Sequence, residues 1–66
     1  MELLEQTRVA MRELSDTDRE ILELRHFEEL SNTECAAALG IEVKAASIRY
    51  IRSLKRMKEI MESRML

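Results

Sequence analysis

Apolar residues recur along the chain at the spacing of an α-helix, with polar residues between them. Leu4, Met11 and Leu14 follow one another at intervals of seven and three. This pattern predicts a short amphipathic helix within residues 1–13 whose Glu and Arg side chains face outward. The polar run 15–18 then interrupts the pattern and supplies side chains that can cap a new helix.

A second helix is predicted from about Asp16 to about Phe27. Asp18 and Glu20 fall in its first turn, where the helix dipole favours negative charge. The two glutamates at 28–29 mark its exposed end. Its apolar side is formed by Ile21, Leu22, Leu24 and Phe27.

A capping box marks the start of a third helix. Ser31 is followed three residues later by Glu34, so each side chain can bond the backbone N–H of the other, and Leu30 supplies the apolar contact that often precedes such a cap. The alanines at 36–38 are small enough to admit a neighbouring helix axis. Gly40, the one glycine of the chain, stands where a left-handed residue would close the helix.

A fourth helical pattern starts at Lys44 and meets no breaker before the end of the chain. Because a left-handed glycine redirects the chain, this helix should leave the turn at a steep angle. Ile41 and Val43 are expected to pack beneath the turn. Residues 31–57 therefore predict a helix-turn-helix.

The last helix has two faces of different character. Spacings of four, three and four place an inward stripe at Ala46, Tyr50, Ser53 and Met57. The residues that fall largely on the other side are Lys44, Ser47, Ile48, Ile51, Arg52 and Lys55. From 43 to 58 the chain holds six basic residues and no acidic one, so this face suits an anion.

Composition limits the fold and the chemistry. Sixty-six residues allow one domain, 1–66, with a small core, since a chain of about 60 residues buries only about 60% of its unfolded surface. The chain has no proline and only two aromatic residues, and good helix formers dominate it. These features favour an all-α fold, a compact four-helix domain with a C-terminal helix-turn-helix. We expect no enzyme activity, no cofactor and no small-molecule substrate.

Isolated reactive side chains give no further site. Cys35, the only cysteine, cannot form an internal disulfide and occupies an apolar helix position, which favours packing over redox chemistry. His26 has no partner at metal-ligand spacing and is expected on the surface. A solvated face is the expected role of Glu20, Glu23, Glu28 and Glu29. With no signal peptide and no apolar run of membrane-spanning length, the cytoplasm fits best.

The net charge of −2 hides an asymmetry between the two halves of the chain. Residues 1–40 hold four arginines and ten acids, whereas residues 41–66 hold seven basic residues and three acids. Screening over about 8–10 Å separates such regions, so a basic helix on an acidic support can attract phosphate locally. The overall charge therefore does not exclude nucleic acid.

Three stretches of the chain, 14–16, 19–41 and 46–57, resemble region 4 of bacterial sigma-70-type RNA polymerase sigma factors, closest to the extracytoplasmic-function group. The resemblance covers nearly the whole chain and keeps its spacing. It implies a four-helix domain whose last helix enters the major groove of the minus-35 promoter element. It also implies a second surface that docks on the flap of the polymerase beta subunit.

The resemblance implies a set of DNA-binding residues. Base-facing positions fall on Ser47, Ile48, Ile51 and Arg52, backbone-contacting positions on Asn32 and Thr33, and phosphate positions on Lys44, Arg49 and Lys55. Arginine is shaped to bond guanine O6 and N7 together, so Arg52 is the best candidate for base readout. Ile48 and Ile51 suit thymine methyl groups. Two positions depart from the family: Ser47 replaces a common Lys or Arg, and Tyr50 a common Leu or Ile.

Two alternatives stay open. The acidic first half, or a tail containing Ile60, Met61, Met65 and Leu66, can dock a protein: the polymerase flap, an anti-sigma factor or a second copy. A LuxR-type response-regulator helix-turn-helix shares the look of residues 19–22 and 30–32, but Arg49 and Arg52 favour sigma. Whether the chain is a piece of a longer sigma factor also stays open.

Overall fold

The computed structural model describes the backbone of residues 2–65 and the side chains of residues 5–63. Its elements are α1 (Glu2–Arg12), α2 (Asp16–His26), α3 (Asn32–Leu39) and α4 (Val43–Met65), and no strand occurs among these residues. The predicted all-α fold with four helices is confirmed, and the ends of the predicted helices agree to within one or two residues. The predicted apolar contact of Leu4 lies outside the described side chains.

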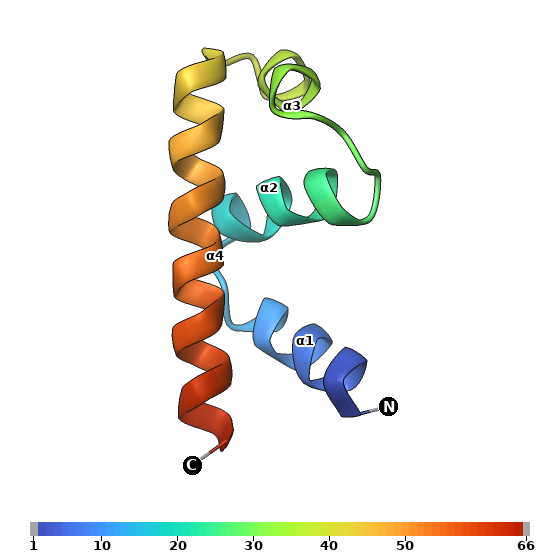
Figure 1. Ribbon diagram of the computed structural model, residues 1–66, viewed down its shortest axis with the longest axis vertical. Coiled ribbons are helices and arrows are strands. Elements are labelled where there is room, and N and C mark those ends of the chain that lie inside the picture. Colours follow the sequence, from blue (N-terminus) through green and yellow to red (C-terminus); the bar gives the residue numbers. More distant parts are fainter. Residues whose placement is uncertain (1, 66) are drawn as a thin grey trace.

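Helix α4 is the axis of the molecule. Its 23 residues extend about 34 Å at 1.5 Å per residue, close to the longest dimension of the molecule, 37 Å. In Figure 1, α1, α2 and α3 lie along one side of α4, and each of them packs against it. The opposite side of α4 therefore remains uncovered by the other helices.

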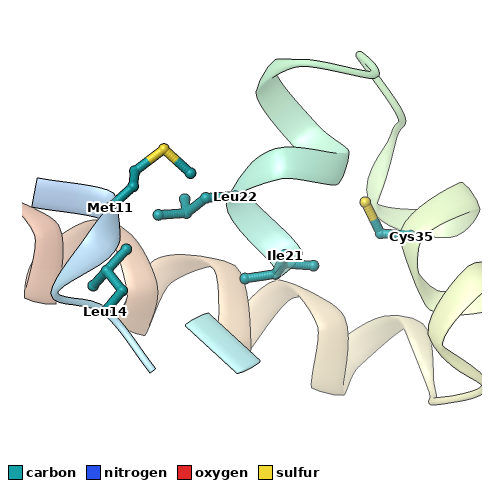
Figure 2. Close-up of a cluster of buried hydrophobic side chains, with 5 residues drawn as sticks. All are labelled: Met11, Leu14, Ile21, Leu22 and Cys35. Atoms are coloured by element: carbon teal, nitrogen blue, oxygen red, sulfur yellow. The ribbon is translucent and has the colours of Figure 1, made fainter. Parts of the chain in front are cut away.

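The core lies between α4 and the shorter helices. Figure 2 shows five of its buried side chains, which come from the end of α1, the turn after it, α2 and α3: Met11, Leu14, Ile21, Leu22 and Cys35. Partly buried residues pack against this cluster, namely Leu24, Leu30, Leu39, Tyr50, Met57 and Ile60. The prediction is confirmed for Ile21, Leu22 and Leu24 on α2.

Two apolar predictions are wrong. Phe27 is 59% exposed because α2 ends at His26, and the chain then turns away through Glu29, whose φ is +57°. Val43 is 44% exposed, as the first residue of α4. The alanines at 36–38 were expected to be small enough to admit a neighbouring helix, and Ala36 is buried.

Caps fix where α2 begins. The Oγ of Ser15 accepts a hydrogen bond from the backbone N–H of Asp18 at 3.2 Å. The carboxylate of Asp18 accepts a second bond from the hydroxyl of Ser53 at 3.0 Å. Ser53 is fully buried, so its place on the inward stripe of α4 is explained by this partner.

The turn between α3 and α4 has the predicted geometry. Ser31 Oγ accepts from the N–H of Glu34 at 3.1 Å, while Glu34 Oε1 accepts from the N–H of Ser31 at 2.8 Å. Gly40 has φ +69° and ψ +35°, and the N–H of Ile41 donates to the carbonyl of Ala36 at 3.0 Å, a Schellman closure. Figure 1 shows α3 almost end-on and α4 from the side, so the chain does bend sharply here.

Candidate nucleic-acid interface

The uncovered side of α4 carries the residues predicted for it. We call the set Lys44, Ser47, Ile48, Ile51, Arg52 and Lys55 the outer face. Ile48 is 41% and Ile51 63% exposed, and all three basic residues of the set are exposed. Ser47 is half-buried. The outer face therefore combines apolar and cationic groups accessible to solvent.

The opposite side of the same helix holds it in place. Ala46 and Ser53 are fully buried, and Tyr50 and Met57 are partly buried against the core. The predicted inward stripe is thus confirmed at all four positions. Because successive residues of a helix turn by 100°, burying this stripe fixes the outer face toward solvent.

The basic residues of the outer face form no ion pair with the side chains that the structure describes. No acidic residue lies in α4 before Glu59, and none of the six basic side chains between 43 and 58 forms an ion pair with a described residue. The positive end of the helix dipole adds to the charge of Lys44 in the first turn. The exposed glutamates at 20, 23, 28 and 29 belong to α2 and the loop after it. The structure thus supports local attraction of an anion by α4.

Arg49 and Arg52 stand at the border between α4 and the start of α2. They line a hollow of about 430 Å³ together with Thr17, Asp18, Ala45 and Ile48. Arg49 is half-buried there, whereas Arg52 is exposed. The two arginines therefore extend the cationic surface from the outer face toward the beginning of α2.

A chain of hydrogen bonds links three helices beside the outer face. Arg25 Nη1 on α2 donates to Asn32 Oδ1 on α3 at 2.6 Å, and Asn32 Nδ2 donates to Ser47 Oγ on α4 at 2.9 Å. The structure thereby joins two predicted site residues, Asn32 and Ser47. Arg25 was missed by the sequence reasoning, because nothing in its spacing shows that its side chain reaches α3.

Tyr50 and His26 lie next to this chain of hydrogen bonds, at the Arg25 end. The guanidinium carbon of Arg25 lies 4.3 Å from the centroid of the Tyr50 ring, a cation–π arrangement. The Tyr50 hydroxyl is 2.9 Å from His26 Nε2, and the two rings are 5.6 Å apart. His26 is exposed as predicted, and its partner is this tyrosine.

The remaining predicted residues lie at the start of α3 or in the core. Thr33 is exposed in the first turn of α3. Cys35 is fully buried, which confirms packing, and burial raises the pKa of its thiol above the ordinary 9.0, with the charge of Arg25 lowering it less. No group of three His, Cys, Asp or Glu in the described part of the chain could hold a metal. Nor is any helix in that part long and apolar enough to cross a membrane.

The sequence is similar to those of known proteins. The family described as "Sigma-70, region 4" matches residues 4–57. The RNA polymerase sigma-E factor of Streptomyces antibioticus is 39% identical over 55 residues, 83% of this chain and 31% of that protein. The RNA polymerase sigma-E factor of Streptomyces avermitilis is 39% identical over 51 residues, 77% of this chain and 28% of that protein.

This chain spans about a third of the length of these curated relatives. No solved structure shows a significant match to it. The matching family covers all of α2 and α3 and the part of α4 that carries the outer face. The agreement of fold, exposed basic helix and family match leads to one conclusion: the chain belongs to the sigma-70 region 4 family.

Proposed function

We propose that the chain binds promoter DNA as the region 4 part of an RNA polymerase sigma factor in the cytoplasm, contributing to transcription initiation without catalysing a reaction. The observation that carries this proposal is the outer face, on which Ile48 and Ile51 lie exposed among basic residues that form no ion pair with any described side chain. Large exposed apolar side chains on a cationic helix suit a partner that offers both phosphates and apolar base edges. A duplex major groove, about 12 Å wide, accepts a helix of about 10–12 Å diameter.

In this proposal the residues of the interface divide into base readers and phosphate contacts. Arg52 bonds a guanine edge, Ser47 bonds a neighbouring base, and Ile48 and Ile51 meet thymine methyl groups. The phosphate contacts come from Lys44, Arg49 and Lys55 on α4, and from Thr33 with Asn32 at the start of α3. The free N–H groups of that helix start favour a phosphate.

Docking on the polymerase core is a second proposed function, favoured by one observation. An apolar hollow of about 300 Å³ lies between α1, α2 and α4, lined by Thr7, Met11, Leu22, His26, Phe27, Leu54 and Met57. Phe27 is 59% and Leu54 40% exposed at its rim. An apolar segment of the beta flap, or of an anti-sigma factor, would cover these side chains. In the predicted tail, Ile60 and Met61 are half-buried, while the side chains of Met65 and Leu66 lie outside the described part.

Two alanine substitutions on the outer face test DNA binding. We expect Arg52→Ala to weaken binding to a duplex selected by the chain by roughly 5- to 150-fold, the range for one bidentate base contact, with less effect on a scrambled duplex. Lys55→Ala should weaken both duplexes alike and reduce the salt slope by about one. The measurement is fluorescence anisotropy titration at several salt concentrations.

Both side chains are exposed, and neither forms an ion pair with residues 5–63, so thermal unfolding should be unchanged and serves as the control. Equal losses on selected and scrambled duplex for Arg52→Ala would count against base readout. Firm capture of polymerase core, without binding to any duplex, would favour the docking function instead.

A further inference from the structure

The hydroxyl of Ser47 is oriented by residues on two other helices. A guanidinium has only donors, so the atom of Asn32 that meets Arg25 at 2.6 Å must be its carbonyl oxygen. The amide nitrogen of Asn32 then points at Ser47, 2.9 Å away, and can only donate. Ser47 Oγ must therefore be the acceptor of that bond, and its own proton has to point elsewhere.

Arg25 is itself held in place, so it can fix the donor and acceptor roles of Asn32 and Ser47. It is half-buried and packs over the ring of Tyr50 at 4.3 Å, and Tyr50 is tied in turn to His26. The guanidinium thus cannot swing away from Asn32 without losing a second contact. The orientation of the Asn32 amide follows from the chemistry of Arg25, and the direction of the Ser47 proton follows from Asn32.

No residue in the described part of the chain accepts the O–H of Ser47. A serine hydroxyl has one proton and two lone pairs. Since Asn32 uses one lone pair, the proton remains available at the edge of the outer face. Ser47 adjoins Ile48 and lies one helical turn before Ile51, two residues proposed above to face bases.

On the basis of the proposed DNA binding, we propose that Arg25 and Asn32 act as positioning residues that make Ser47 a hydrogen-bond donor to DNA. Its partner is a base acceptor in the major groove, such as N7 or O6 of guanine or O4 of thymine. Arg25 thereby affects base preference from α2, without touching DNA. We call the hydrogen-bonded series Arg25, Asn32 and Ser47 the relay, and its polarity is the direction in which each bond is donated. The base preferred at the pair that Ser47 contacts depends on this polarity as well as on Ser47 itself.

The substitution Asn32→Asp reverses the polarity. An aspartate has two acceptor oxygens, so it keeps the bond to Arg25 and takes the proton of Ser47, which leaves only lone pairs facing DNA. A negative side chain at the start of α3 is favoured by the helix dipole, so the fold is retained. Added negative charge weakens binding to all duplexes alike, so the readout is the preference among bases.

Arg25 offers a matched pair of variants. Arg25→Lys keeps a side chain with donors only and should preserve the orientation of Asn32. Arg25→Gln presents either a donor or an acceptor, so Asn32 is free to flip and the polarity of Ser47 is no longer fixed. A purely structural role for Arg25 would make these two variants similar in base preference at equal stability.

The experiment selects duplexes from a randomised library with the unmodified chain and with each variant, then sequences the bound pool. Ser47→Ala identifies the base pair that Ser47 contacts, where we expect the unmodified chain to prefer an acceptor by roughly 2- to 12-fold, the range for one hydrogen bond. Asn32→Asp should shift that pair toward bases with an amino donor, cytosine or adenine. Arg25→Gln should flatten the preference, and Arg25→Lys should retain it.

Circular dichroism of each variant confirms that it is folded. An unchanged preference in Asn32→Asp, or no pair affected by Ser47→Ala, overturns the relay while leaving DNA binding intact. If the unmodified chain enriches no duplex at all, the proposed function fails, and this proposal fails with it.

Discussion

Replacing Gly40 with L-alanine and with D-alanine isolates the contribution of one left-handed residue to this fold. Gly40 adopts φ +69°, and a Cβ added to it meets nothing within 4 Å. For L-alanine, steric contacts with residues other than its two chain neighbours therefore contribute nothing. What remains is the backbone preference of the residue itself.

The size of this backbone preference is the difference in the free energy of unfolding between the L-alanine and D-alanine proteins. An L-residue in the left-handed region costs roughly 1–2 kcal/mol, whereas a D-residue prefers that region. The loss of unfolded-state freedom on going from glycine to alanine, roughly 0.4–1 kcal/mol in favour of folding, is the same for both enantiomers. The difference between them is thus about 1–2 kcal/mol, with D-alanine more stable than glycine and L-alanine less stable.

A chain of 66 residues is within reach of chemical synthesis, so all three proteins can be compared directly. At about 4–8 °C per kcal/mol for a domain of this size, thermal unfolding by circular dichroism should separate the two alanine variants by roughly 4–16 °C. Asparagine at this position is a useful fourth case because it tolerates the left-handed region. Equal midpoints for the two enantiomers, or destabilisation by both, would refute the argument.

Two further predictions concern buried side chains. Burial raises the pKa of the Cys35 thiol above 9.0, so the thiol stays neutral in the folded chain at a pH where it ionises in the unfolded chain. The contribution of Cys35 to the free energy of unfolding is therefore complete below about pH 9 and is lost as the pH rises further. The difference in urea unfolding free energy between the native chain and Cys35→Ala should be flat below pH 9 and fall above it; a flat difference throughout would contradict this. Ser53→Ala removes the bond to Asp18 and should cost roughly 0.5–1.5 kcal/mol relative to Ser63→Ala on the exposed side of α4. Equal urea midpoints for these two variants would show that the bond contributes nothing.

Local signals were sufficient to predict the elements. The capping box at Ser31, the glycine at 40 and the inward stripe of α4 each depend on residues within one or two helical turns, so the chemistry that fixes them is visible in the sequence. The outer face followed from the same stripe, because placing one side of a helix inside places the other outside.

The sequence predictions failed where the burial or contact of a side chain depends on how two or more helices pack together. Phe27 has the spacing of a core residue, but α2 ends one residue earlier and the chain turns away. The relay from Arg25 through Asn32 to Ser47 spans separations of 7 and 15 residues and exists only once three helices have docked. Periodicity within one helix carries no information on such a contact.

Helix α4 carries two sets of residues that alternate along its length: the buried inward stripe, which holds the other helices, and the exposed outer face. A change at Ile48, Ile51 or Arg52 leaves Ala46 and Ser53, and hence the docking of the other three helices, untouched. Changes in the chemistry of the outer face and changes in folding therefore fall on separate positions of one helix. The exposed surface of such a helix can therefore be altered by point mutation with little effect on the stability of the domain.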